Sequence, residues 1–327
     1  MAVVAQKKRG ILIVNLGSPK KLTVRSVRRF LREFLSDPRV VNLPRSLWWV
    51  ILNFFILPFR PRKSKAAYAE VWTERGSPLT FLTQDLTDKV ATHYQDNPHT
   101  TVAMAMSYGA PSLIAQLRKL KKAQCEQITI VPLYPQYSST TTASVFDAVA
   151  TELMQWRYIP ELHFISDYHQ HILYIGAIAD SIQKTWSEQS AGELLLMSFH
   201  GLPDILTKKG DPYYYQCLKT AELIAKKLNL KDDKWRVVFQ SRFGKAKWLQ
   251  PYCIETLMAL PEEGFKNIDI ICPGFAIDCL ETLEEINMTN KEIFFEAGGE
   301  QYRYIPCLND SGANVQLMVD LIENKAN

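Results

Sequence analysis

Motifs that define several common enzyme classes are missing from this chain of 327 residues. It has no Gly-x-Gly-x-x-Gly turn, no Walker loop and no His-Glu-x-x-His helix. Because the first two supply the backbone donors that hold nucleotide phosphates, a nucleotide-dependent enzyme is not expected. The net charge is only +4. A nucleic-acid partner, which would require a dense basic surface, is therefore not expected either.

Paired cysteines are missing as well. The six cysteines are scattered without a Cys-x-x-Cys spacing, and the N-terminal residues Met1–Arg9 lack the long apolar core of a signal peptide. We therefore expect a protein of the reducing cytoplasm. The cysteines are Cys125, Cys217, Cys253, Cys272, Cys279 and Cys307.

No apolar run is long enough to cross a bilayer. The longest, Leu47–Phe59, is interrupted by Asn53 and Pro58, whereas a spanning helix needs about 20 residues. Its cationic flanks suit a segment that dips into a lipid interface beside anionic headgroups, peripheral on the inner membrane face. A buried core helix explains the same run equally well. The flanking cations are Arg45, Arg60, Arg62, Lys63 and Lys65.

Short β-branched, apolar runs alternate with longer amphipathic segments along the whole chain. This alternation predicts an α/β protein with parallel sheets and right-handed crossovers. The first helix, for example, should be capped by Thr23 and should end before Asp37-Pro38. The expected strands are Gly10–Asn15, Thr101–Met106, Gln127–Pro132, Glu161–Ile165, Glu193–His200, Trp235–Gln240 and Asn267–Cys272.

The length of the chain exceeds what a single core usually supports. Two similar doubly wound (Rossmann-like) domains are predicted, residues 1–158 and 159–327, with the active-site cleft between them. The hydrophobic segment 47–59 belongs to the first domain as a lip of that cleft. A final helix, Ala313–Ile322, is expected to pack on either domain, including back on the first.

One histidine stands where such folds bind ligands. His200 ends the apolar run that begins at Glu193, and Gly201 follows it, so its side chain should lie at the carboxyl end of a strand. His169 and His171 also follow a strand and are the alternatives. A lone histidine is more often a hydrogen-bonded structural residue, but the abrupt turn after His200 favours a chemical role.

Three acids follow a later strand. Asp278, Glu281 and Glu285 are spaced by three and four residues, which places their side chains on one face of a helix. An acid-rich first helical turn explains Asp278 and Glu281 without any ligand. Imidazole and carboxylate also suit iron(II) or zinc, and few protein ligands leave positions open for exchange. We therefore predict metal delivery coupled to proton removal.

Long, ordered segments then carry a resemblance over nearly the whole chain: Val14–Pro19, Phe30–Val41, Ser77–Leu79, Tyr134–Ser138, Ser198–Pro203, Gly210–Tyr213, Phe239–Gly244, Trp248–Pro251 and Glu281–Leu283. In these segments the chain resembles the ferrochelatases, lyases that insert iron(II) into protoporphyrin IX in the last step of protohaem synthesis and release two protons. The resemblance implies that His200 and Glu281 are both catalytic residues and metal ligands, with Asp278 and Glu285 as a path for protons or metal. It also implies porphyrin contacts from Leu16, Arg60, Tyr68, Tyr134, Tyr137, Ser138 and Phe199.

Departures from the family pattern sharpen these expectations. Ser107 stands where relatives commonly carry an arginine, which places one propionate contact in question. Ser139 stands where cluster-holding relatives have a cysteine, and Cys307 is the single late cysteine, so no iron-sulfur cluster and no other cofactor is expected. Leu16, where the coproporphyrin-using branch tends to have a tyrosine, favours protoporphyrin IX.

Two kinds of alternative function stay open. A related chelatase would act on coproporphyrin or another tetrapyrrole, although a polyacidic ring would need more cationic contacts than the apolar segments provide. A non-catalytic haem or porphyrin carrier would use His200 as an axial ligand and would not need the opposing acids. The expected partners are protoporphyrin IX and Fe²⁺, and the protein is expected to be a monomer or weak dimer.

Overall fold

The computed structural model describes residues 7–244 and 246–324 of the chain. Two compact units are present: unit 1 contains Met1–Leu133, Ser139–Asp167 and Asp310–Asn327, and unit 2 contains Tyr134–Ser138 and Tyr168–Asn309. Residues 1–6 of the N-terminal segment Met1–Arg9, for which no signal peptide is expected, lie outside the described residues.

Unit 1 is built on a four-stranded parallel sheet in the order β2-β1-β3-β4. Its strands are β1 (Arg9–Asn15), β2 (Thr100–Met106), β3 (Gln127–Pro132) and β4 (Glu161–Phe164), within one residue of the predicted bounds. The central strand β1 is buried on both faces, because Ile11, Leu12, Ile13 and Val14 are fully shielded from solvent. Such continuous apolar strands are typical of parallel sheets that helices cover on both sides.

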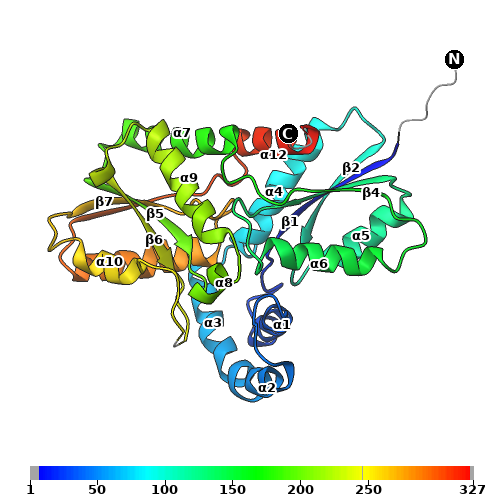
Figure 1. Ribbon diagram of the computed structural model, residues 1–327, viewed down its shortest axis with the longest axis horizontal. Helices are drawn as coiled ribbons and strands as arrows, with labels where there is room; N and C mark the ends of the chain where they lie inside the picture. Colours follow the sequence, from blue (N-terminus) through cyan, green and yellow to red (C-terminus); the bar gives the residue numbers. More distant parts are fainter. Residues whose placement is uncertain (1–6, 245, 325–327) are drawn as a thin grey trace. The chain divides into compact units, whose positions relative to one another are not determined.

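The helices of unit 1 follow the predicted β-α alternation (Figure 1). Thr23 caps α1 as predicted, since its hydroxyl accepts a hydrogen bond of 3.2 Å from the Ser26 amide. The helical elements are α1 (Val24–Leu35), α2 (Arg45–Val50), the π-helix η1 (Ile51–Ile56), α3 (Leu57–Val71), α4 (Pro78–His93), α5 (Leu113–Lys122), α6 (Thr142–Leu153) and α12 (Gly312–Glu323).

Unit 2 repeats this topology with a four-stranded parallel sheet in the order β6-β5-β7-β8. The strands are β5 (Leu194–His200), β6 (Trp235–Gln240), β7 (Asn267–Ile271) and β8 (Gln301–Ile305). The helices are α7 (Ile172–Glu188), α8 (Asp204–Lys208), α9 (Tyr213–Lys227), the 3₁₀ turn η2 (Asp232–Lys234), α10 (Cys253–Ala259), the π-helix η3 (Glu281–Thr289) and α11 (Asn290–Glu296). In each unit the second strand along the chain lies on one side of the first strand, and the third and fourth strands lie on its other side. The predicted pair of similar doubly wound domains is confirmed.

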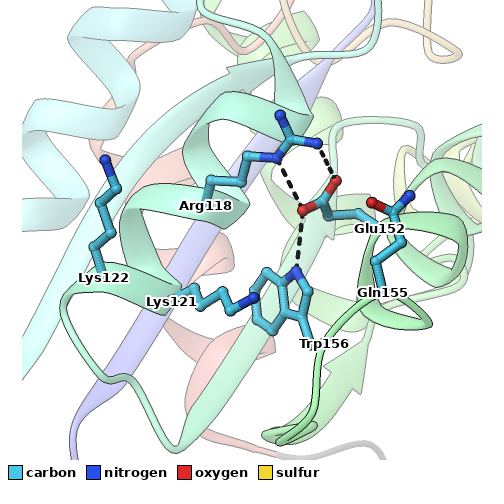
Figure 2. Close-up of a pocket in the computed structure, with 6 residues that line it drawn as sticks. All are labelled: Arg118, Lys121, Lys122, Glu152, Gln155 and Trp156. Carbon is cyan, nitrogen blue, oxygen red and sulfur yellow. Dashed lines mark hydrogen bonds and ion pairs between the residues drawn. The ribbon is translucent and has the colours of Figure 1, made fainter.

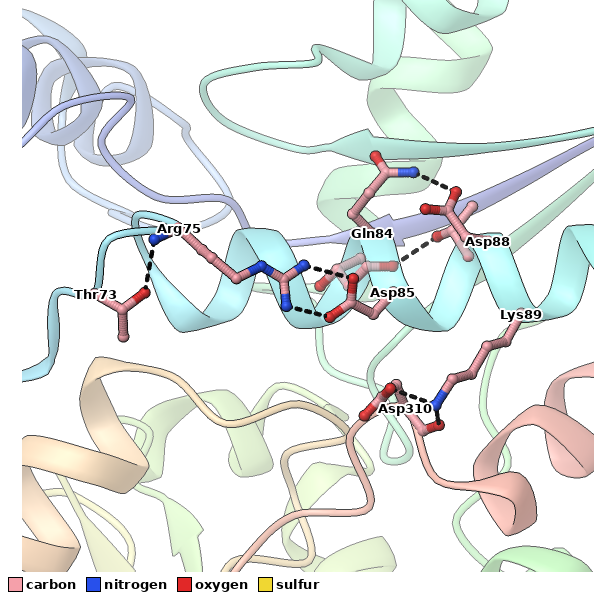
Figure 3. Close-up of polar contacts among 9 residues, drawn as sticks. Thr73, Arg75, Gln84, Asp85, Asp88, Lys89 and Asp310 are labelled. Carbon is pink, nitrogen blue, oxygen red and sulfur yellow. Dashed lines mark hydrogen bonds and ion pairs between the residues drawn. The ribbon is translucent and has the colours of Figure 1, made fainter.

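The division between the units differs from the predicted boundary between residues 158 and 159. Unit 1 continues to Asp167 because β4 pairs with β3, from Gln127↔Glu161 to Ile130↔Phe164. The C-terminal helix α12 also belongs to unit 1, where it packs on α4 and β3. Lys89 on α4 donates to both the carboxylate and the backbone carbonyl of Asp310, at 2.5 and 2.8 Å, which anchors the segment that leads into α12 (Figure 3).

The hydrophobic segment 47–59 has one buried face and one exposed face. Trp48, Leu52 and Leu57 are buried, and the indole N–H of Trp48 donates to the Leu35 carbonyl at 2.6 Å. The opposite face is solvent-exposed although it is strongly apolar. It consists of Leu47, Trp49, Val50, Phe54, Phe55 and Phe59, and Phe59 is 71% exposed. Over residues 7–244 and 246–324, no helix has the length and apolar character needed to cross a membrane.

Candidate active site

His200 lies at the carboxyl end of β5, the strand from which the chain departs to β6 on one side and, later, to β7 on the other. This switch point is where open α/β sheets bind ligands. The imidazole Nδ1 lies 2.7 Å from the carbonyl oxygen of Gly201. Because a carbonyl only accepts, Nδ1 carries the hydrogen, and the neutral ring keeps its lone pair on Nε2.

Backbone contacts fix the position of His200. The amide of Gly201 donates to the Gln240 carbonyl at 2.8 Å, and a Cβ at position 201 would lie only 2.7 Å from that oxygen. Glycine is therefore required by the close approach of β6. On the other side, the Tyr213 hydroxyl donates to the His200 carbonyl at 3.0 Å. The turn after His200, which begins at Gly201, thus allows β6 to pack closely beside the histidine.

Gln240 connects the histidine strand with the acidic helix. It is the register partner of His200 across β5 and β6, and its side-chain Nε2 donates to the Glu281 carbonyl at 2.9 Å. Glu281 begins η3, and its side chain is half-buried. The structure therefore brings His200 and Glu281 to the same edge of unit 2. Gln240 belongs to the segment Phe239–Gly244, and nothing in the sequence of that segment predicts this connecting role.

Glu285 lies one turn along η3 and is held by Ser241. The Ser241 amide and hydroxyl donate to the two carboxylate oxygens at 2.7 and 2.5 Å. Burial raises the pKa of Glu285, the bonds from Ser241 and the charge of His200 oppose the rise, and the charge of Glu281 adds to it. The pKa of Glu285 is therefore affected by the charges of both His200 and Glu281. Ser241 has φ of +63°, a left-handed conformation that is uncommon outside glycine and often marks functional sites.

The acids lie on a π-helix, where sequence periodicity predicted an ordinary helix. The wider i→i+5 turn is rare and occurs often at functional sites. Hydrophobic spacing does not separate the two helix types over nine residues, so this feature was missed. Glu281 and Glu285 remain near one another along the helix.

Asp278 has a different environment from the two glutamates. Its carboxylate is buried and accepts hydrogen bonds from Thr282, Tyr304, Cys307 and Asn309. The Tyr304 and Asn309 bonds measure 2.5 and 2.7 Å. Tyr304 links the loop before η3 to β8, and Cys307 and Asn309 link that loop to the segment after β8. Asp278 therefore acts as a structural anchor here, and the path role predicted for it receives no support from this geometry.

Of the four predicted porphyrin contacts in unit 2, two side chains are half-buried and two are buried. Tyr134 and Tyr137 are half-buried, and the Tyr137 amide donates to Gln216 at 2.6 Å. Ser138 is 1% exposed and its hydroxyl donates to Asp211 at 3.2 Å. Phe199 has no exposed surface and packs against Phe239. Because β5 is buried on both faces, the ligand contact predicted for Phe199 is corrected to a core role.

The predicted contacts in unit 1 lie at the end of β1 and on α3. Leu16 follows β1, and its amide donates to the Asn15 side chain at 2.8 Å. Arg60 and Tyr68 lie two helical turns apart on α3; Tyr68 is buried against Trp72, and burial lowers the pKa of Arg60. At the end of β2, Ser107 lies where an arginine was expected, with a buried hydroxyl that has no hydrogen-bond partner among the described residues.

The histidine alternatives differ in their surroundings. His171 is the N-cap of α7, where its Nδ1 accepts a hydrogen bond of 3.3 Å from the Leu173 amide. This contact accounts for His171 without a ligand. The carbonyl of His169 accepts from the Thr220 hydroxyl at 2.8 Å. For His200, in contrast, the electrostatic effect on Glu285 of η3 connects the histidine to an acid.

The six cysteines are buried, unpaired by disulfides and scattered through the two units. Among the described residues, no three His, Cys, Asp or Glu side chains are grouped closely enough to hold a metal ion. Burial raises the pKa of the Cys253 thiol to about 12, so this side chain is kept neutral.

A cavity of about 530 Å³ lies elsewhere, between α5 and α6 of unit 1 (Figure 2). It contains none of the predicted site residues. Both carboxylate oxygens of the buried Glu152 are bound by Arg118 at 3.0 and 2.9 Å, and the Trp156 indole adds a third bond of 3.0 Å. Lys121 lies over the Trp156 ring. Because these groups satisfy one another, the contacts explain helix packing rather than catalysis.

The fold is shared with known chelatases. SirB from Bacillus subtilis with Fe³⁺ matches with a TM-score of 0.58 at 10% identity, covering 98% of this chain and 96% of that chain. CbiX, the terminal enzyme for biosynthesis of sirohaem in denitrifying bacteria, matches with a TM-score of 0.52 at 16% identity, covering 98% and 100%. At these identities the likeness concerns the fold alone.

Sequence relatives define the family. A family model described as Ferrochelatase matches residues 8–326. Ferrochelatase of Methylococcus capsulatus is 53% identical over 314 residues, covering 96% of this chain and 95% of that protein. Ferrochelatase of Vibrio cholerae is 49% identical over 317 residues, covering 97% and 98%. The chain belongs to the ferrochelatase family, metal-chelating lyases that insert iron into a porphyrin in haem biosynthesis.

Proposed function

We propose that the edge of unit 2 that carries His200, Glu281 and Glu285 is the metal-insertion site, and that protoporphyrin IX is the porphyrin. The observation that carries this proposal is the link through Gln240, whose backbone pairs with His200 and whose side chain binds the Glu281 carbonyl. A base and a carboxylate are thereby held on neighbouring elements.

In the proposed mechanism, His200 accepts a pyrrole proton through Nε2. Its Nδ1–H is held by the Gly201 carbonyl, so the ring presents the lone pair of the other nitrogen to the substrate. A free-base porphyrin has two N–H protons that must leave as iron(II) enters. Imidazole is the side chain most often used to accept such a proton.

Glu281 is proposed to bind the incoming iron together with His200 while the imidazole is still unprotonated, and then to take the second pyrrole proton as the iron enters the ring. Two protein ligands leave coordination positions open, as a metal that must be handed over requires. Glu285 is proposed to relay protons behind Glu281, since its raised pKa brings its titration closer to neutrality. Asp278 is left out of this path because its carboxylate is saturated by donors.

Protoporphyrin IX is proposed over coproporphyrin because Leu16 stands at the end of β1. Further porphyrin contacts are proposed from Arg60, Tyr134 and Tyr137. No resident iron-sulfur cluster or other cofactor is proposed. We further propose a cytoplasmic monomer or weak dimer that associates with anionic membranes through the exposed apolar face of segment 47–59.

The test is anaerobic incubation of the purified protein with iron(II) and, in parallel, protoporphyrin IX or coproporphyrin III. Formation of the metalloporphyrin spectrum is followed for each. The proposal predicts a higher kcat/KM for protoporphyrin IX. A preference for coproporphyrin would overturn the substrate assignment, and haem binding without insertion of iron would support the carrier alternative.

A further inference from the structure

Gln240 is a buried glutamine at a strand end, 2% exposed, with no apparent need for a polar side chain in the core. Its backbone lies beside His200: the two residues are register partners, and the Gln240 carbonyl accepts the Gly201 amide at 2.8 Å. Any movement of Gln240 would therefore move the turn that holds the imidazole.

The Gln240 side chain reaches three further elements. Its Oε1 accepts from the Ser198 hydroxyl at 2.8 Å and lies 3.7 Å from the Cys272 sulfur, and its Nε2 donates to the Glu281 carbonyl at 2.9 Å. The orientation of the amide is determined chemically, because the Glu281 carbonyl only accepts and the Ser198 hydroxyl can donate. One side chain thus links β5, the end of β7 and the start of η3.

We propose that Gln240 is a positioning residue that sets the place of Glu281 relative to His200. Within the part of the chain that the structure describes, η3 begins without a side-chain cap, so the bond to the Glu281 carbonyl is a direct tie between its first residue and the sheet. The inference rests on the proposed roles of His200 and Glu281. Gln240 itself does not touch substrate.

Two substitutions of Gln240 separate positioning from simple packing. Gln240→Met keeps the volume and removes the donor to Glu281. Gln240→Glu keeps the shape and restores a donor only when the new carboxyl is protonated. The matched control is Gln116→Met in unit 1, because Gln116 is also a buried glutamine whose Nε2 donates to a backbone carbonyl, that of Met104 at 2.7 Å.

A carboxylate at position 240 would place an oxygen against the Glu281 carbonyl, and two acceptors cannot share a hydrogen bond. Gln240→Glu should therefore lose kcat at least as strongly as Gln240→Met. Gln240→Met should lose kcat by about 10- to 100-fold, the range for residues that orient metal ligands.

The measurements are kcat, the KM values for porphyrin and iron(II), and the pH profile of each variant, with thermal unfolding as the check on folding. The porphyrin KM is expected to change by less than about twofold. Loss of the Gln240 amide should displace Glu281 in the transition state and should not alter the binding of porphyrin. A kcat for either Gln240 variant that equals that of Gln116→Met would overturn the proposal.

Should both variants fail to fold, Ser198→Ala gives a milder test. It removes the hydroxyl that orients the Gln240 amide and should lower kcat while leaving porphyrin affinity unchanged; an unaltered kcat counts against positioning. A failure of the proposed metal-insertion site can be distinguished from a failure of the role proposed for Gln240. If the site assignment is wrong, His200→Ala retains metal insertion, whatever the Gln240 variants do.

Discussion

Ser241 donates its amide to one oxygen of the Glu285 carboxylate and its hydroxyl to the other, at 2.7 and 2.5 Å. Both carboxylate oxygens therefore accept hydrogen bonds from the residue that follows β6. Burial raises the pKa of this carboxyl above its ordinary value of 4.5. The folded protein holds a proton on Glu285 more tightly than the unfolded chain does.

This raised pKa predicts a pH-dependent stability. The contribution of Glu285 is fully present below its unfolded pKa and is lost as the pH rises through the folded pKa, because the folded state then gives up the tighter-held proton. Relative to Glu285→Gln, the wild type should thus lose stability as the pH rises above about 4.5. Thermal unfolding of both proteins across this range measures the difference.

The control for this series is Glu284→Gln, on the same π-helix, whose carboxylate accepts an exposed bond from Thr289. Its stability difference from the wild type should vary little with pH. A Glu285→Gln difference that is equally flat would show that the folded pKa is not raised.

Gly201→Ala should impair catalysis through the position of His200. The added Cβ would lie 2.7 Å from the Gln240 carbonyl oxygen, so the turn after β5 must shift. A displacement of about 1 Å at a catalytic group can lower the rate by about 100-fold. We expect a large loss of kcat with porphyrin binding retained, measured by steady-state insertion and fluorescence quenching.

Gly176→Ala is the control for this substitution, because a Cβ at that position on α7 meets no atom within 4 Å. It should leave kcat unchanged and increase stability by about 0.5–1 kcal/mol, as expected for glycine in a helix interior. Equal kcat values for the two variants would contradict the role assigned to Gly201.

Asp269 should be far more important to stability than a surface charge. It is 1% exposed and accepts from Arg303, the Trp186 indole and the Gly192 amide at 2.7, 2.6 and 2.9 Å. Asp269→Asn places an amide N–H₂ against one of these donors. The free energy of unfolding should fall by about 3–5 kcal/mol, the usual effect of breaking a buried pair.

The contrasting change is Lys266→Ala, which removes an exposed pair with Glu300 of 2.9 Å. It should cost less than about 1 kcal/mol. Denaturant titration of both variants makes the comparison. Similar losses for the two would contradict the burial argument.

The exposed apolar face of segment 47–59 should mediate binding to anionic vesicles. Trp49 and Phe55 are 60% and 64% exposed, so Trp49→Glu with Phe55→Glu should reduce co-sedimentation with phosphatidylglycerol vesicles without unfolding the protein. Trp48 is unsuitable for this test because it is buried and bonded to Leu35. Ile172→Glu, at an 81% exposed position in unit 2, is the control. Unchanged vesicle binding by the double variant would mean that the face does not contact lipid.

Much of the fold could be predicted because the strands of parallel sheets are continuous apolar runs. Seven strands were predicted close to their observed bounds, whereas β8 was not, because Gln301–Ile305 alternates polar and apolar residues and contains Arg303. The partner of that arginine, Asp269, lies 34 residues earlier. Strand order and long-range polar pairs of this kind are tertiary facts that local periodicity does not encode.

The candidate site was predicted unevenly for a similar reason. His200 ends β5 and Glu281 lies on the helix after β7, so their placement at the same edge of unit 2 could be expected. The roles of Asp278 and Phe199 were expected from the family resemblance. The structure gives Asp278 four hydrogen-bond donors and Phe199 a fully buried environment. Gln240 and Ser241 could not be assigned at all, because their function depends on which side chains face them.

The most direct test of the account is single-turnover metal insertion by His200→Ala, with porphyrin binding measured on the same preparation and His163→Ala as the control. His163 lies on β4 of unit 1, bonded to Gln127 and Glu161. The account predicts that His200→Ala binds protoporphyrin IX normally and inserts iron at least about 100-fold more slowly, as removal of a general base requires. Insertion at the wild-type rate by His200→Ala would contradict it.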